Sequence, residues 1–241
     1  MITTTRMAET ALYDLMSWMS PAWPIGSFAH SSGLEWAVEQ GHVTDRASTA
    51  EWIGTLIVRG SIHNDLVLFA YAWRAADAGD AAGLYEVAEL AAASQTGFER
   101  RLEATAQGAA FRKIAIASLD PPRHGTDLAA LLAPIDDEDL AYPIVAATLF
   151  ARQGIALRPA LTAWLHGAAA NLVSAAQRLV PLGQTDGQKV LRALREPIFA
   201  AVEAAATLPD ADPFEAFGGC ALVAELGCMA HESQYTRLFR T

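Results

Sequence analysis

One group of residues in this chain could be taken for a hydrolytic triad. Ser27, His30 and Glu35 supply a hydroxyl, an imidazole and a carboxylate, the three groups that activate a serine nucleophile. The corresponding turn in serine hydrolases has a Gly-x-Ser-x-Gly pattern after a strand, and neither the glycines nor a strand pattern is present here. The sequence also lacks a phosphate-binding loop, a dinucleotide fingerprint and carboxylates paired for acid–base catalysis. We therefore predict that the protein is not an enzyme.

Metal binding is the second chemistry to consider, at Cys228 and His231. The two residues are three positions apart, so both could face one side of a helix or its end. Two ligands from one chain make a weak site, although a dimer could bring four together. A nickel carrier that uses this pair is therefore one alternative function. The competing interpretation is that Cys220 and Cys228 are small apolar core residues, with no tightly bound cofactor.

The segment from Arg178 to Gln188 is rich in amides and glycine but carries no catalytic group. Pro181 and Gly183 predict a turn between two helices. Thr185 and Gln188 have the spacing of a helix capping box. Two polar stripes at helical spacing flank this corner: Gln184, Gln188, Arg192 and Arg195 on one side, and Gly167, Asn171, Ser174 and Arg178 on the other. Because arginine is enriched at interfaces, we predict a docking surface here.

Two further segments draw attention. The loop from Ser20 to Gly26 is stiffened by two prolines. Ser32 and Glu35 again have capping-box spacing, so Glu35 is expected to cap a helix. The C-terminal segment 231–241 contains two aromatic residues and two arginines, a composition typical of interfaces. We predict that this tail docks on a partner, and that its deletion leaves the helical fold intact.

The elements that must position these residues are helices. Apolar residues recur every three or four positions along most of the chain, most clearly from Leu157 to Leu179, and no segment alternates with the period of a strand. We expect an all-α fold, a single compact bundle-like domain over residues 1–241 with roughly ten helices and a polar C-terminal tail. One long helix is expected from Phe214 to Met229.

Composition excludes several partners. The formal net charge of −10 and the absence of any basic run argue against nucleic-acid binding. The longest apolar stretch, from Leu140 to Ala151, is too short for a membrane span of about 20 residues. No signal peptide pattern begins the chain, so we expect a cytoplasmic protein. Hydrophobic residues make up 52% of the chain and charged residues only 18%, which favours a permanent partner or self-association.

Three blocks together resemble the UreF family of urease accessory proteins. The first runs from Ser20-Pro-x-x-Pro-Ile-Gly-Ser-Phe28 to Ser32-Gly-Leu-Glu35. The second runs from Asn171-Leu-Val-Ser-Ala175 through the corner that ends at Gln188, and the third is His231-Glu-Ser-Gln-Tyr-Thr-Arg-Leu-Phe-Arg240. They occur in the order that the family shows and cover the chain from near its start to its C-terminus.

The resemblance implies an all-α accessory protein that is not itself an enzyme. UreF-like proteins form homodimers, bind the accessory protein UreD (also called UreH) and recruit the GTPase UreG. The assembly docks on apo-urease and delivers nickel, which would be bound only transiently. In this family the C-terminal segment becomes ordered on the UreD-type partner. The residues expected to contact partners are Pro24, Gly26, Ser27, His30, Gly33, Glu35, Asn171, Arg178, Pro181, Gly183, Gln184, Gln188, Arg192, Glu232, Gln234, Tyr235, Arg237 and Phe239.

One alternative from the residues alone remains open beside the nickel carrier. The chain could be a helical ligand-binding or regulatory domain with an interior pocket lined by its tryptophan and phenylalanine residues.

Overall fold

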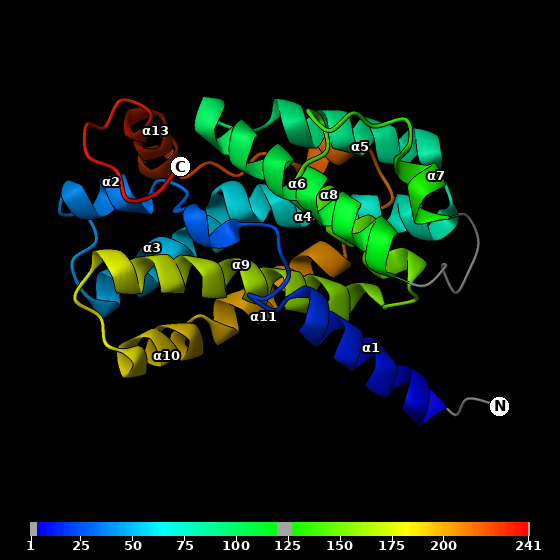
Figure 1. Cartoon of the computed structure of the whole chain (residues 1–241), viewed down its shortest axis with the longest axis horizontal. Coiled ribbons are helices and arrows are strands. Elements are labelled where there is room, and N and C mark those ends of the chain that lie inside the picture. Colours follow the sequence, from blue (N-terminus) through cyan, green and yellow to red (C-terminus); the bar gives the residue numbers. More distant parts are fainter. Residues whose placement is uncertain (1–3, 120–126, 241) are drawn as a thin grey trace.

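The computed structural model describes residues 4–119 and 127–240, and over these ranges the protein is all-α, as predicted (Figure 1). Ten helices have ten or more residues: α1 (Thr4–Trp18), α3 (Arg46–Arg59), α4 (Ser61–Ala78), α5 (Ala81–Ala93), α6 (Phe98–Ser118), α8 (Tyr142–Arg152), α9 (Leu157–Leu179), α10 (Gln184–Ala193), α11 (Arg195–Ala206) and α13 (Leu222–His231). Shorter helices are α2 (Leu34–Glu39), α7 (Leu128–Leu132), α12 (Pro213–Ala216) and the 3-10 turn η1 (Ser27–Ala29).

Helices α4 and α8 form the centre of the molecule. Every residue from Pro143 to Arg152 is buried, as expected for a helix that is apolar on all sides. Helix α4 packs against α3, α5, α8 and α9, so it too is covered on several sides. The one cation in α8, Arg152, donates to the carbonyl oxygen of Ala76 at 2.8 Å in the last turn of α4. A guanidinium at a helix C-terminus satisfies carbonyls that have no partner within the helix.

Helix α6 approaches the segment before α8 unusually closely. A Cβ atom built on Gly108 would lie 1.9 Å from the carbonyl oxygen of Leu140, so only glycine fits at this position. This close contact sets where along its axis α6 packs against α8. Glu99, Arg100 and Glu103 lie on the same helix, about one and a half to two and a half turns before Gly108.

A second, smaller core lies at the end of the molecule where α2, α13 and the C-terminus meet (Figure 1). It joins residues of α2 and α9 to Phe239 near the chain end: Leu34, Ala37, Val43, Ala175, Ala176, Val180 and Phe239. The C-terminal segment is therefore part of the folded protein and packs on its own chain.

Helix α9 spans the predicted residues Leu157–Leu179, and the turn at Pro181 and Gly183 is also confirmed. Two predictions about helix ends are wrong. Gly183 is the N-cap of α10, and no side chain accepts a hydrogen bond from that end, so Thr185 and Gln188 do not form a capping box. Gly33 is the N-cap of α2, and Ser31 accepts from the amide of Glu35, so Ser32 and Glu35 do not form a capping box and the Glu35 carboxylate has another role.

The expected helix from Phe214 to Met229 is divided in two. Helix α12 ends at Ala216 and α13 begins at Leu222, with an irregular segment between them. Gly219 lies in this segment, against the backbone of Arg59, and its amide and carbonyl both pair with the side chain of Asn64. An asparagine amide replaces the helical partners of this backbone, which explains the interruption. No helix in the described ranges has the length and apolarity that crossing a membrane requires.

Candidate functional site

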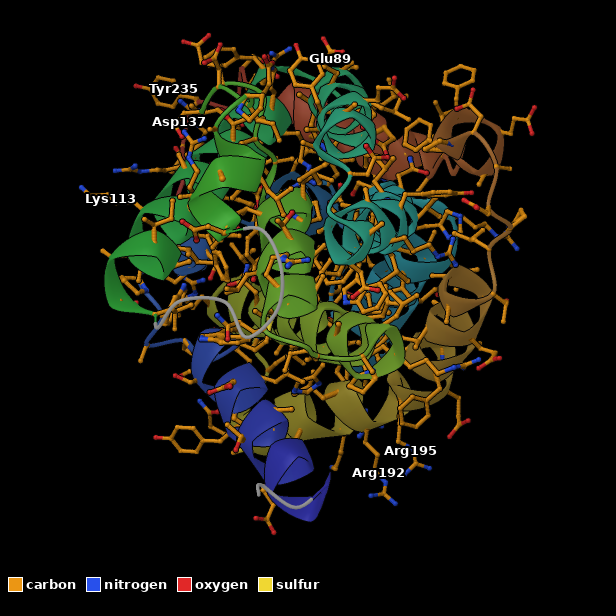
Figure 2. All side chains as sticks on the ribbon, turned by 90° about the vertical axis from the view of Figure 1, so that its right-hand side faces the viewer. Glu89, Lys113, Asp137, Arg192, Arg195 and Tyr235 are labelled. Carbon is orange, nitrogen blue, oxygen red and sulfur yellow. The ribbon has the colours of Figure 1, made fainter. Side chains whose placement is uncertain are left out.

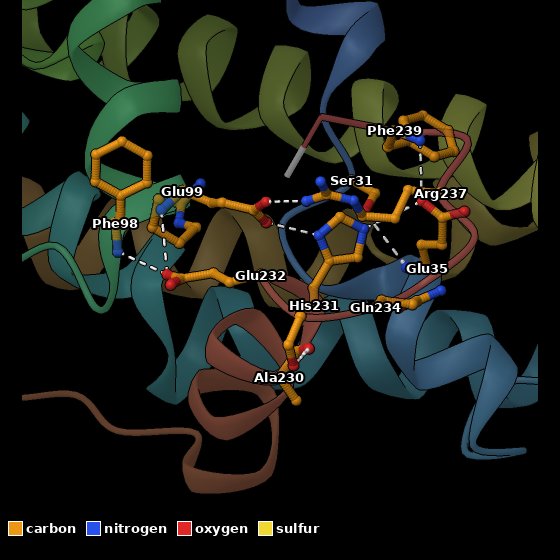
Figure 3. Close-up of polar contacts among 12 residues, drawn as sticks. Ser31, Glu35, Phe98, Glu99, Ala230, His231, Glu232, Gln234, Arg237 and Phe239 are labelled. Carbon is orange, nitrogen blue, oxygen red and sulfur yellow. Dashed lines mark hydrogen bonds and ion pairs between the residues drawn. The ribbon is translucent and has the colours of Figure 1, made fainter.

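The three sequence blocks meet around the C-terminal segment. Glu35 from the first block contacts His231 and Phe239 from the third (Figure 3), and Arg178 from the second block packs on the ring of Phe239. Helix α6 contributes a fifth member, Glu99. We call these five residues the tail cluster.

Glu35 holds the tail by its backbone. One carboxylate oxygen accepts from the amide of Leu238 at 2.6 Å, and the other accepts from the amide of Phe239 at 2.9 Å. The second oxygen also lies 3.2 Å from Nε2 of His231. Glu35 is only 7% exposed, and buried carboxylates are stable only when paired in this way. Its role is therefore to fasten the end of the chain, across about two hundred residues of sequence.

His231 bridges two carboxylates and is fully buried. Its Nδ1 lies 2.6 Å from Glu99, opposite the contact with Glu35 (Figure 3). A carboxylate only accepts hydrogen bonds, so each ring nitrogen that faces an ionised carboxylate must carry a proton. Arg237 donates to the other oxygen of Glu99. Two basic side chains, His231 and Arg237, therefore face the carboxylates of Glu35 and Glu99.

Glu232 binds the exposed N-terminus of α6. Its Oε1 accepts from the amides of Phe98 at 2.7 Å and Glu99 at 3.3 Å, which no side chain of α6 itself caps. A carboxylate at this position satisfies free amides and interacts favourably with the helix dipole. Helix α13 is thereby tied to α6 at the same point where His231 contacts Glu99.

Arg178 covers the tail from the other side. Its guanidinium lies 4.2 Å from the ring centre of Phe239 and donates to the carbonyl oxygen of Phe28 at 2.7 Å. The amide of Arg240 donates to the carbonyl of Ala29, also in the first block. Arg178 therefore belongs to the tail cluster. Helix α9 is joined to α10 by Gln177, which donates to Gln184 at 3.3 Å.

The tail predicted to dock on a partner is fastened to its own chain at several points. Phe239 is 4% exposed and His231 is fully buried, whereas Tyr235 is fully exposed. Gln234 is half-buried, and Glu232 and Arg237 are bound to α6. Deleting residues 231–241 would uncover Glu35 and the smaller core, so the deletion is expected to destabilise the fold, contrary to the expectation from the sequence. Thr241 lies outside the described residues.

The first-block candidates are divided between surface and interior. Pro24 is exposed, Gly26 and Ser27 are half-buried, and His30, Gly33 and Glu35 are buried. Gly33 has a φ of 79° and lies directly on the backbone of Cys228, so a side chain could not be placed there. These buried residues shape the fold around the tail cluster, and cannot touch a partner while the tail is seated.

The weak metal pair does not form in this conformation. Both ring nitrogens of His231 face carboxylates, and burial raises the pKa of the Cys228 thiol to about 12, which disfavours the thiolate that metals require. Among the described residues, no group of three or more His, Cys, Asp and Glu side chains could hold a metal ion. Cys228 packs in the interior, as the competing interpretation expected, but Cys220 is exposed.

The corner residues lie at the surface. Arg178, Pro181, Gly183, Gln184, Gln188 and Arg192 are all exposed, and Asn171 is half-buried. Figure 2 shows Arg192 and Arg195 pointing away from the protein, at the opposite end of that view from Tyr235. This arrangement is compatible with a docking surface on α10, distinct from the tail cluster.

Sequence analysis missed an apolar surface on α13. Leu222, Leu226 and Met229 share one face of the helix and are 64%, 53% and 46% exposed, and Val223 is exposed beside them. Phe98, 71% exposed, adjoins Met229 through the Gly97 contact. The buried side carries small residues, and Gly227 touches the ring of Trp36. We call the exposed residues Leu222, Val223, Leu226, Met229 and Phe98 the α13 face.

The comparisons with known proteins place the chain by its sequence. A sequence model of the UreF family matches residues 43–195. A protein of Bradyrhizobium diazoefficiens named "Urease accessory protein UreF" is 44% identical over 231 residues, covering 96% of this chain and 92% of the relative. A protein of Rhodopseudomonas palustris with the same name is 45% identical over 235 residues, covering 96% and 94%. The chain therefore belongs to the UreF family of urease accessory proteins.

Proposed function

We propose that this protein is a non-enzymatic chaperone of urease maturation that works in the cytoplasm as a homodimer. It binds a UreD/UreH-type accessory protein and the GTPase UreG, and the assembly supports GTP-dependent insertion of nickel into apo-urease. Nickel is the cargo and is held only transiently. Membership of the UreF family supports the maturation role. The partners and the nickel step are proposed from the resemblance and from the surfaces described above.

The observation that carries this proposal is the α13 face. Large aliphatic and aromatic side chains are contiguous and exposed there, which is typical of an interaction surface. It adjoins the tail cluster through Glu232, so a partner bound to α13 would also contact the tail, including the fully exposed Tyr235. We assign the α13 face to the UreD-type partner.

The test is to replace Leu226 with aspartate. Because the side chain is 53% exposed, we expect little change in the free energy of unfolding, about 0.5 kcal/mol or less. A carboxylate in the middle of an apolar interface would be desolvated without a partner. Size-exclusion chromatography after co-expression with a UreD-type protein should therefore show co-elution for the wild type and none for the Leu226→Asp variant.

The matched control is Phe199→Asp on α11, where the side chain is 50% exposed and lies outside the α13 face. This variant should co-elute as the wild type does. The size of the Leu226→Asp variant alone reports whether the homodimer is intact. Undiminished co-elution of Leu226→Asp would refute the assignment of the α13 face, and failure of the wild type to co-elute would refute the proposed function.

A second prediction concerns the α10 surface. Arg192 is exposed, and its side chain makes no hydrogen bond or ion pair with the residues that the structure describes, so Arg192→Ala should shift the melting temperature by no more than a few degrees. If the corner contacts a partner, urease activation in cells that express the maturation genes should fall. A large drop in melting temperature with normal activation would instead assign Arg192 to the fold.

A further inference from the structure

A cavity of about 480 Å³ opens beside the first block and is not part of either surface described above. It lies between the loop after α1, the N-terminal half of α6, the start of α8 and the middle of α9. Exposed residues such as Pro24 and His166 form its rim, so solvent can enter. The volume falls in the range of sites for small molecules, roughly 300 to 1,000 Å³.

The walls of the cavity are aromatic and rigid. Trp18, Trp23, Tyr142 and Trp164 line it, and each is packed against a ring of the core. Trp23 and Tyr142 both contact Phe111, at centroid distances of 5.6 and 5.5 Å. Rings held in this way are preorganised, because a guest does not have to order them.

The inner end of the cavity is acidic. Asp65, Arg100 and Glu103 line it and are all buried. Arg100 donates to Glu103 at 2.7 Å and lies 3.6 Å from Asp65, so one guanidinium faces two carboxylates. Burial lowers the pKa of the neighbouring His30, so its ring is neutral at pH 7 and adds no second cation. Two buried carboxylates therefore share one guanidinium in a poorly solvated place.

Asp65 shows that burying a carboxylate here is unfavourable. Burial raises its pKa to about 6, even though Arg100 opposes the shift. A buried charge of this kind is stabilised when a counter-charge is brought next to it.

We propose that the cavity binds a small organic cation, an ammonium group carried on an apolar body. The aromatic walls suit such a guest, because tryptophan and tyrosine rings attract ammonium groups, and the carboxylates supply the counter-charge. An anion would meet Asp65 and Glu103. A neutral apolar guest would leave their charge uncompensated. A metal ion would have Arg100 between its two carboxylate ligands.

This inference does not depend on the role in urease maturation. It rests on the cavity alone, and its test uses the purified full-length chain without any partner. Failure of one proposal therefore leaves the other standing.

The experiment compares choline with its uncharged isostere, in which a tert-butyl group replaces the trimethylammonium group. Titration is followed by calorimetry and by the fluorescence of the cavity tryptophans. We expect choline to bind roughly tenfold more tightly than the isostere, the factor that one desolvated cation–π or ionic contact provides. Equal affinity of the two compounds, or saturable binding of neither, would overturn the proposal, and this comparison needs no variant.

Two variants locate the site. Glu103→Gln removes one carboxylate and should weaken choline binding about tenfold while leaving the isostere unchanged. Glu89→Gln, on the exposed surface of α5 and outside the cavity, is the matched control and should bind choline as the wild type does. Wild-type affinity in a folded Glu103→Gln protein, verified by circular dichroism, would contradict the assigned site.

Discussion

Replacing Glu35 with alanine is expected to lower the free energy of unfolding by about 3 to 5 kcal/mol, the loss typical of breaking a buried ionic network from one side. The variant would remove the acceptor for the amides of Leu238 and Phe239 and one of the two carboxylates beside His231. These donors would then be buried without partners, which is more costly than the loss of the hydrogen bonds themselves. Chemical denaturation followed by circular dichroism measures the change.

The control is Glu39→Ala on the same helix. Glu39 is exposed, so its loss should change the free energy of unfolding by about 0.5 kcal/mol or less. Similar stabilities for the Glu35→Ala and Glu39→Ala variants would show that Glu35 does not fasten the tail. A double-mutant cycle with Phe239→Ala adds a second criterion. Since both residues act on one segment, the two losses should not be additive.

The role of Glu35 could not be predicted from the sequence, and the reason is physical. Capping boxes are local patterns, and the serine three residues before Glu35 matched one. The actual partners of Glu35 are more than 190 residues away in the chain, and periodicity carries no information about such contacts. The same holds for His231, whose spacing from Cys228 suggested a metal pair.

Local features were predicted well. Helix α9 and the turn that follows it are encoded by apolar spacing, Pro181 and Gly183, all within a few residues of one another. The break between α12 and α13 was missed because it depends on Asn64, a residue of α4 far away in the chain. Apolar residues continue at helical spacing across this segment, but its backbone does not form a continuous helix.

The α13 face shows how burial can invert a helical pattern. The large residues Leu222, Leu226 and Met229 would be expected to face the core, yet they are exposed. Before His231, the buried side carries the small residues Ala224, Gly227 and Cys228, because α2 approaches this helix so closely that a Cβ on Gly227 would meet Trp36 at 2.6 Å. A small-residue stripe opposite a large-residue stripe is a signal that could have indicated the exposed face.

The tail itself separates into residues that hold the fold and a residue available to a partner. Phe239 is buried against Arg178 and the smaller core, and Phe239→Ala should lower the free energy of unfolding by about 3 kcal/mol or more, as for other buried phenylalanines. Tyr235 is fully exposed, and Tyr235→Ala should leave stability unchanged within about 0.5 kcal/mol. Thermal unfolding of the two variants measures this contrast.

Tyr235→Ala, which should hardly change stability, should have a large effect on partner binding. Tyr235 follows the end of α13 by four residues and is fully exposed, so Tyr235→Ala should weaken the complex with a UreD-type protein by roughly tenfold or more, the effect of a hot-spot residue. Phe239→Ala should weaken this complex only because the tail unfolds. Lowering the temperature, which stabilises the folded tail, should therefore restore part of the binding. If Tyr235→Ala bound as tightly as the wild type, the seated tail would serve the fold alone, and the partner would be recognised by α13 without it.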